Sequence, residues 1–125
     1  MEHRVEIVLV ESNLADVYLF RQALRDITPQ PDLTILDGGP NTLERLAELH
    51  PDLVVSAWKL PFYSAPEFIT AVRKLPVLKD VPIAVLTTFP EDHQQLLDLG
   101  LVRWINKPIG AAQVEDLLSV LPRKD

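Results

Sequence analysis

The residues best suited to chemistry in this sequence stand where predicted strands end. Glu11 and Ser12 follow the first buried strand, Thr87 closes the fourth, and Lys107 follows the fifth. A carboxylate can bind a metal ion through its oxygens, and hydroxyls and an ammonium can bind phosphoryl oxygens. The third strand differs, because the stretch "PDLVVSAWKLP" places Ala57 at the equivalent point. A methyl group supplies no nucleophile and no metal ligand, so we expect no reaction at that position.

The elements that position these residues are apolar, β-branched runs that alternate with segments of helical period. Strands are predicted at Arg4–Val10, Leu33–Asp37, Asp52–Ser56, Ile83–Thr87 and Val102–Asn106. Helices are predicted between and after them, the fourth running through Leu99 and the last carrying Val114 and Leu121. This alternation predicts a parallel sheet with right-handed crossovers and helices on both faces.

Three helix starts carry capping residues. Asn13 is expected to cap the first helix, and Ser64, with Glu67 three residues on, the third. Asn41, with Glu44 three residues on, forms a similar capping-box pattern before the second helix, which runs through Leu49. The segments between the elements are short, so we expect a single domain over residues 1–125.

The strand ends resemble those of the receiver domain of bacterial two-component response regulators. The similarity is carried in order by "IVLVESNLADVYLFRQAL", "PDLVVSAWKLP", "VPIAVLTT" and "INKP", and it runs over essentially the whole chain. It implies a flavodoxin-like α/β fold: a doubly wound, five-stranded parallel sheet in the order 2-1-3-4-5. In such sheets ligands lie outside the carboxyl ends of the strands.

Carried over residue by residue, the resemblance implies a degenerate phosphorylation pocket. Glu11 keeps the first of two acidic positions, whereas Ser12 replaces the second with a neutral hydroxyl. Ala57 falls on the phosphoacceptor position, so the aspartyl-phosphate of the family cannot form there. Thr87 and Lys107 match the signalling hydroxyl and the phosphate-pairing lysine of the family.

We expect the pocket to bind no metal, because one carboxylate remains of three and Lys59 brings a cation toward the same cleft. We also expect Lys107 to form an ion pair with Glu11 in place of the missing phosphoryl group. The alternative is that both are solvated charges at strand ends, which would contribute little. Trp104, at the position of the family's aromatic switch, is either a packing residue or an interface anchor, and its place on a strand favours the second.

Composition excludes several other classes. The chain has 125 residues, no cysteine and a net charge of −6, and it contains no cluster of basic residues. Nucleic acid binding is therefore not expected, since an acidic surface repels phosphates. No apolar run is long enough to cross a membrane, and no signal peptide pattern stands at the start, so we expect a cytoplasmic protein.

These observations favour a stand-alone pseudo-receiver that is not an enzyme, holds no cofactor and acts by binding a protein independently of phosphorylation. The partner would be a signalling protein or another receiver, including a second copy in a homodimer. The expected surface is the face formed by the fourth helix, the fifth strand and the fifth helix. Two alternatives remain: a response regulator phosphorylated on a non-standard residue such as Ser56 or Ser64, and a flavodoxin-like binder of a small ligand.

Overall fold

The strands form one parallel sheet in the order β2-β1-β3-β4-β5. A computed structural model describes residues 4–87, 98, 103–119 and 121. The strands are β1 (Glu6–Val10), β2 (Asp32–Leu36), β3 (Leu53–Ala57), β4 (Ile83–Thr87) and β5 (Arg103–Asn106). The predicted order is confirmed. The predicted helix through Leu99 and the predicted strand residue Val102 lie outside the described residues.

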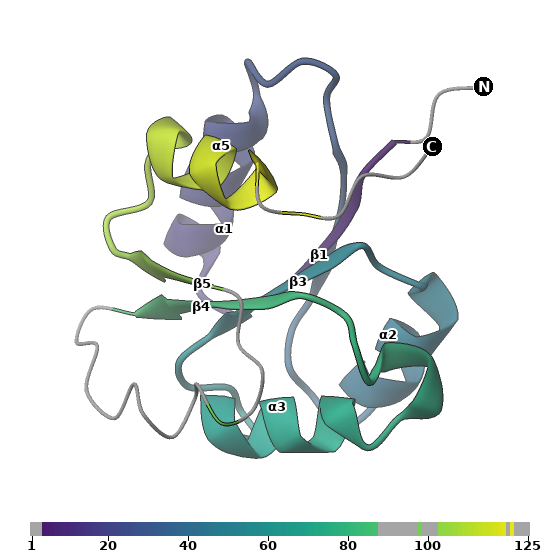
Figure 1. Ribbon diagram of the computed structural model, residues 1–125. Coiled ribbons are helices and arrows are strands. Elements are labelled where there is room, and N and C mark those ends of the chain that lie inside the picture. The colour runs from purple at the N-terminus through teal and green to yellow at the C-terminus, as the bar shows by residue number, and fades with distance from the viewer. Residues whose placement is uncertain (1–3, 88–97, 99–102, 120, 122–125) are drawn as a thin grey trace.

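Helices cover both faces of the sheet, as predicted (Figure 1). On one face lie α1 (Leu14–Leu24) and α5 (Ala111–Ser119), and on the other lie α2 (Thr42–Leu49) and α3 (Ala65–Arg73), which is followed by the short 3-10 helix η1 (Pro76–Leu78). β3 and β4 are buried along their whole length, which explains their uninterrupted apolar sequences.

Each face has its own hydrophobic core. Phe20 of α1 and Leu117 of α5 pack with one set of strand side chains. Phe68 of α3 and Leu46 of α2 pack with the other. Burial of this many apolar side chains is the main stabilising contribution to the fold, and it fixes the strand ends from which the polar side chains project.

The helix starts agree with two of the three predicted caps. The Asn13 side chain accepts a hydrogen bond from the Asp16 amide at 3.0 Å. Ser64 and Glu67 form a complete capping box on α3. The prediction for Asn41 was wrong: its φ of −99° and ψ of 9° are not the extended conformation that a side-chain cap requires, and its side chain makes no cap hydrogen bond.

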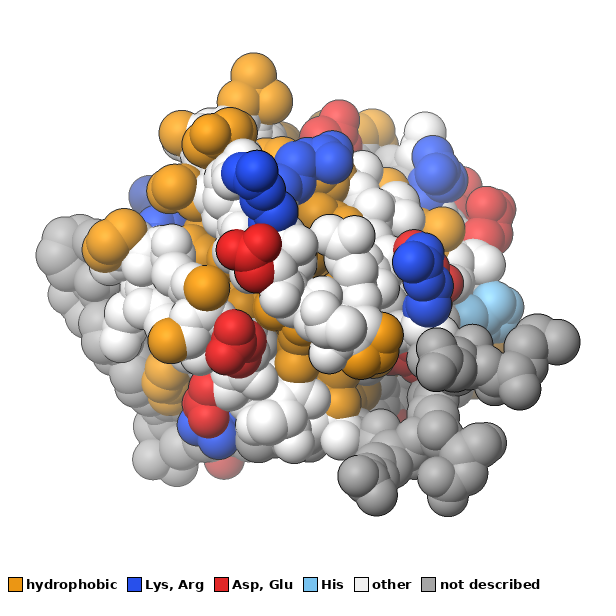
Figure 2. All heavy atoms as spheres, turned by 90° about the horizontal axis from the view of Figure 1, so that it is seen from above, with side chains coloured by type: hydrophobic (Ala, Val, Ile, Leu, Met, Phe, Trp, Pro, Cys, Tyr) orange, Lys and Arg blue, Asp and Glu red, His pale blue; other side chains and the backbone are white. Residues whose placement is uncertain are grey.

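Two absences hold within the part of the chain that the structure describes. None of its helices combines the length and apolar character that crossing a bilayer requires. Charged side chains of both signs are interspersed on the face that α1 and α5 cover, and neither sign gathers into a patch there (Figure 2).

Candidate functional site

The first residue of the candidate site is Glu11, which follows β1 directly. Its side chain is 4% exposed, and Oε2 accepts hydrogen bonds from the amides of Ser12 and Asn13 at 3.0 and 3.1 Å. Oε1 is buried and has no hydrogen bond among the described residues. Burial raises the pKa of the Glu11 carboxyl, while the Asn13 amide and the Lys107 ammonium act in the opposite direction.

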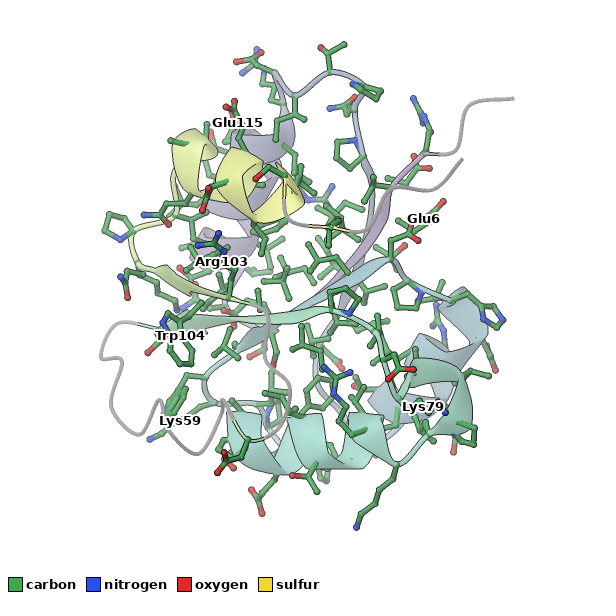
Figure 3. All side chains as sticks on the ribbon, in the orientation of Figure 1. Glu6, Lys59, Lys79, Arg103, Trp104 and Glu115 are labelled. Carbon is green, nitrogen blue, oxygen red and sulfur yellow. The ribbon has the colours of Figure 1, made fainter. Side chains whose placement is uncertain are left out.

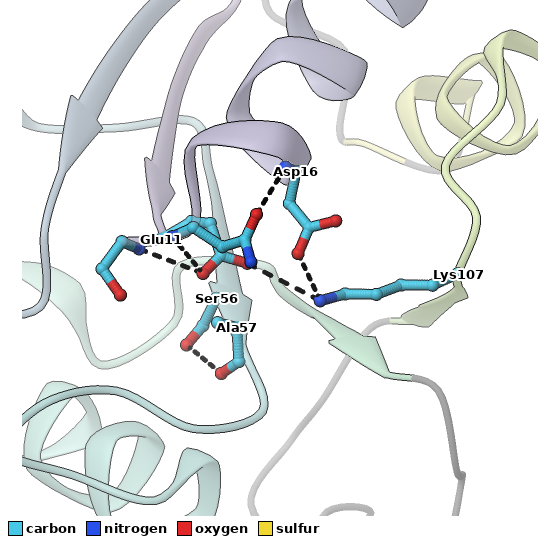
Figure 4. Close-up of polar contacts among 7 residues, drawn as sticks. Glu11, Asp16, Ser56, Ala57 and Lys107 are labelled. Carbon is cyan, nitrogen blue, oxygen red and sulfur yellow. Dashed lines mark hydrogen bonds and ion pairs between the residues drawn. The ribbon is translucent and has the colours of Figure 1, made fainter.

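Lys107 carries the cation of the site, and Asp16 is its main partner (Figure 4). The Lys107 Nζ donates a hydrogen bond to Asp16 Oδ2 at 2.5 Å. The same Nζ lies 3.9 Å from Glu11 Oε1, within reach of an ion pair but not of a hydrogen bond. Lys107 therefore sits between two carboxylates that come from the β1–α1 loop and from the first turn of α1.

The expected ion pair of Lys107 with Glu11 is present, with 3.9 Å between Nζ and Oε1, but it is not the main contact of the ammonium. The contact exists only at the outer limit of an ion pair, and the stronger partner, Asp16, was not predicted. The Asp16 side chain is 14% exposed and the Lys107 side chain 29%, so neither is a freely solvated charge. Asp16 also belongs to the first turn of α1, where a negative charge interacts favourably with the helix dipole.

The end of β3 is apolar. Ala57 is 4% exposed and belongs to the core on the α2 and α3 face. Ser56 is fully buried, and its hydroxyl donates a hydrogen bond to the Ala57 carbonyl oxygen at 2.9 Å. Ser64 is occupied as the cap of α3. Neither serine therefore offers a free hydroxyl to the space next to Ala57.

The remaining predicted residues lie around this centre. Thr87 is 3% exposed, and its carbonyl oxygen accepts a hydrogen bond from the Lys107 amide at 3.0 Å. Trp104 is half-buried and packs against the core on the α2 and α3 face. Lys59 is exposed, and its backbone pairs with Ser64 in an isolated bridge. Figure 3 shows Lys59 and Trp104 at the same end of the sheet.

A family model describing the response regulator receiver domain matches residues 7–119. The chain belongs to the receiver domain family. It is a flavodoxin-like receiver domain of two-component signalling, as the resemblance of its strand ends implied.

Curated relatives of this receiver are longer proteins. The cyclic di-GMP phosphodiesterase response regulator RpfG of Xanthomonas campestris is 27% identical over 110 residues, which are 84% of this chain and 28% of RpfG. The phosphate regulon transcriptional regulatory protein PhoB of Escherichia coli is 26% identical over 86 residues, which are 67% of this chain and 38% of PhoB. The chain thus spans about a third of the length of these relatives.

Solved structures share the fold of this receiver. The chemotaxis protein CheY4 of Vibrio cholerae superimposes with a TM-score of 0.83 at 22% identity, covering 96% of this chain and all of CheY4. The receiver domain of the histidine kinase PA1611 from Pseudomonas aeruginosa, solved with a magnesium ion in its active-site cleft, gives a TM-score of 0.80 at 22% identity, covering 94% of this chain and 96% of that one.

Asp16 is the site residue of this receiver that sequence reasoning missed. The sequence places it in the predicted first helix, after the Asn13 cap, and assigns it no partner. A signal did exist, because Asp16 is three residues after the Asn13 cap and so belongs to the first turn, near the strand ends. What the spacing could not give is its partner, which is 91 residues away along the chain.

Proposed function

We propose that this receiver works without phosphorylation and acts by binding another protein in the cytoplasm. The observation that carries the proposal is the arrangement of Lys107. Its ammonium is hydrogen-bonded to Asp16, while β3 ends in the methyl group of Ala57. A phosphoryl-accepting site needs a nucleophilic oxygen and a cation that is available to the arriving phosphoryl group.

The proposal includes the loss of metal binding. Mg²⁺ requires several hard oxygen ligands in near-octahedral geometry. Here Glu11 Oε2 is engaged by two backbone amides, Oε1 faces Lys107, and position 57 carries no oxygen. The described residues contain no group of three or more His, Cys, Asp or Glu placed to hold a metal ion. The residues present therefore do not fit the magnesium ion of the PA1611 receiver.

In this proposal the Lys107 ammonium acts as a tethered cation. It joins the segment after β5 to Glu11, directly after β1, and to Asp16, in the first turn of α1. Both carboxylates are mostly buried, so solvent screens their attraction to the ammonium less than it would at an open surface. The receiver would be held in one arrangement by an internal ion pair rather than switched between two by a phosphoryl group.

Receiver domains interact with other signalling proteins, and we propose that this one does so through the face around β5 and α5. Trp104 and the exposed residues of α5 belong to this face, whereas the helix before β5 lies outside the described residues. The partner would be a signalling protein or a second receiver, including a second copy of this chain. The protein would not be an enzyme, since its site offers binding groups without a reactive one.

Incubation of the natural chain with acetyl phosphate and Mg²⁺, followed by intact-mass measurement, tests the negative half of the proposal. We expect no phosphate adduct. A covalent phosphate that forms only with the divalent cation would contradict the proposal and would favour a non-standard acceptor residue.

The positive half is tested by affinity capture of partners from the native cell. The same partner should be retained with and without acetyl phosphate, and Trp104→Ala should weaken its retention. Val77→Ala, which alters an exposed apolar residue on η1, is the control. Two results would contradict phosphorylation-independent binding through this face. One is a partner that is retained only with acetyl phosphate, and the other is equal retention by Trp104→Ala and Val77→Ala.

A further inference from the structure

Two carboxylates share one ammonium at the carboxyl end of the sheet (Figure 4). The Lys107 ammonium is hydrogen-bonded to Asp16 and lies 3.9 Å from Glu11 Oε1. The side chains of Glu11 and Asp16 are 4% and 14% exposed. When both carboxyls are ionised, the three groups carry one negative charge in excess. A charge without compensation is unfavourable where water is largely excluded.

The excess charge falls on Glu11. Asp16 accepts a hydrogen bond from the Lys107 ammonium, whereas Glu11 Oε1 is buried and has no hydrogen bond among the described residues. The two amides that hold Glu11, those of Ser12 and Asn13, donate to Oε2 and leave Oε1 without a donor. A proton on Glu11 would therefore remove the charge that the cluster compensates least.

The environment of Glu11 favours this proton. Burial raises the pKa of the Glu11 carboxyl, and the Asp16 carboxylate acts in the same direction, whereas the Asn13 amide and the Lys107 ammonium lower it. Charged side chains on the neighbouring elements are exposed and do not contribute to this pKa; they are Asp37 after β2, Lys59 after β3, Arg21 of α1, Arg45 of α2, Glu67 of α3 and Asp116 of α5. Within the described part of the chain, the proton on Glu11 thus depends on its burial and on the other two members of the cluster.

From this geometry we infer that the cluster is an acid-sensitive switch, in which the proton on Glu11 decides whether Lys107 is shared by two carboxylates or held by Asp16 alone. While Glu11 is ionised, its Oε1 competes with Asp16 for the ammonium. Once Glu11 is neutral, that competition ends. The Lys107 amide is fixed by a hydrogen bond of 3.0 Å to the Thr87 carbonyl oxygen, so we expect the side chain rather than the backbone to respond.

Such a switch would regulate the tethered cation without covalent modification. An ionised Glu11 ties the segment after β5 to the end of β1 as well as to α1, whereas a neutral Glu11 leaves only the tie to α1. This segment leads from β5 to α5, so the face proposed for partner binding would be held by one contact fewer in acid. The inference rests on the tethered cation of the proposed function and not on the absence of phosphorylation.

An NMR titration of the full, carbon-13-labelled chain from neutral to acidic pH tests the inference. The carboxyl carbon shifts of Glu11 and Asp16 report their protonation, and the Cε shift of Lys107 reports the surroundings of its ammonium. We expect Glu11 to titrate with a midpoint above its ordinary value of 4.5. The Lys107 Cε shift should change with the same midpoint.

Two variants separate the members of the cluster. Glu11→Gln keeps the shape of the side chain without its charge, and the Lys107 Cε shift should then lose the change at the Glu11 midpoint. Asp16→Asn should move the Glu11 midpoint to lower pH, because it removes a neighbouring negative charge and frees the ammonium to approach Oε1. Asp116→Asn, which alters an exposed carboxylate on α5, is the control and should leave both titrations unchanged.

Four results would overturn the switch: a Glu11 midpoint at or below 4.5, a Lys107 Cε shift that does not follow Glu11, a change at that midpoint that persists in Glu11→Gln, or a Glu11 midpoint that does not fall in Asp16→Asn. A phosphate adduct formed from acetyl phosphate would contradict the proposed function alone, because these titrations use the unmodified chain.

Discussion

The ends of β1 and β3 are neighbours in the sheet but have opposite chemistry. The two strands pair directly, with Val10 opposite Ser56, so the residues that follow them share one edge. After β1, Glu11 is a buried carboxylate with two backbone donors and a cation nearby. At the end of β3, Ala57 is an apolar side chain that belongs to a hydrophobic core.

The difference indicates which parts of the site serve the fold and which would serve a reaction. Glu11 and Lys107 have a structural use even where no reaction takes place, because the Lys107 ammonium partly compensates the buried Glu11 carboxylate and is hydrogen-bonded to Asp16. A nucleophile at position 57 would have no such structural use. A methyl group in its place costs the fold nothing and favours packing.

The largest expected effect comes from placing a carboxylate at the end of β3, next to the carboxylate that follows β1. Ala57→Asp combined with Ser12→Asp should make the chain form a phosphate adduct with acetyl phosphate and Mg²⁺, which we expect the natural chain not to form. The new carboxylates supply the nucleophile and a metal ligand. Intact mass with and without Mg²⁺ is the measurement.

Each single substitution is the control for this pair, and Ser12→Asp alone should remain unmodified. If the double variant is folded by circular dichroism but takes up no phosphate, the loops have closed around Lys107 and the geometry of the pocket has been lost together with its chemistry.

A smaller effect, on the free energy of unfolding, is expected from removing the ion pair between Lys107 and Asp16. Asp16→Asn removes the carboxylate that holds Lys107 at 2.5 Å, in a pair whose side chains are 14% and 29% exposed. We expect the free energy of unfolding to fall by about 1–3 kcal/mol, because a partly buried ammonium loses its charged acceptor. Urea denaturation at neutral pH measures it.

Asp116→Asn is the matched control. Asp116 pairs with Arg103 at 3.4 Å, and their side chains are 61% and 45% exposed. An exposed pair of this kind is worth little, so the free energy of unfolding should change by less than about 0.5 kcal/mol. An equal loss of unfolding free energy in Asp16→Asn and Asp116→Asn would contradict the view that the more buried ion pair contributes more to stability.

The smallest effect concerns the proton on Glu11. Burial raises its pKa in the folded state above the ordinary 4.5. A carboxyl with a raised pKa favours folding below its unfolded pKa, and this contribution is lost as the pH rises through the folded pKa. In Glu11→Gln this part of the pH dependence should be absent, as urea denaturation at several pH values from acidic to neutral would show.

The difference between the two denaturation profiles isolates Glu11 from the other titrating groups. A difference that grows in favour of the natural chain as the pH rises would mean that Lys107 and the backbone amides outweigh the cost of burying the carboxylate. The pKa of Glu11 would then be lowered by folding, which is the opposite of the expected direction.

Much of the architecture could be predicted because its causes are local. The apolar runs at β3 and β4 are long enough to be read as buried strands, and the Ser64 and Glu67 box is a pattern of neighbours in the sequence. Asn41 failed as a cap for a reason that is also local but not visible in residue types. The turn before α2 places its backbone at a ψ of 9°, and only coordinates give that angle.

The sequence by itself determined that the strand ends would meet at one edge and that Ala57 would be without a reactive group, because both follow from the order of apolar runs and the identity of one side chain. The tertiary structure decided which carboxylate holds Lys107. That choice depends on how α1 packs against the sheet and carries Asp16 toward the end of β5, across 91 residues of chain. Side-chain spacing contains no information about such a distance.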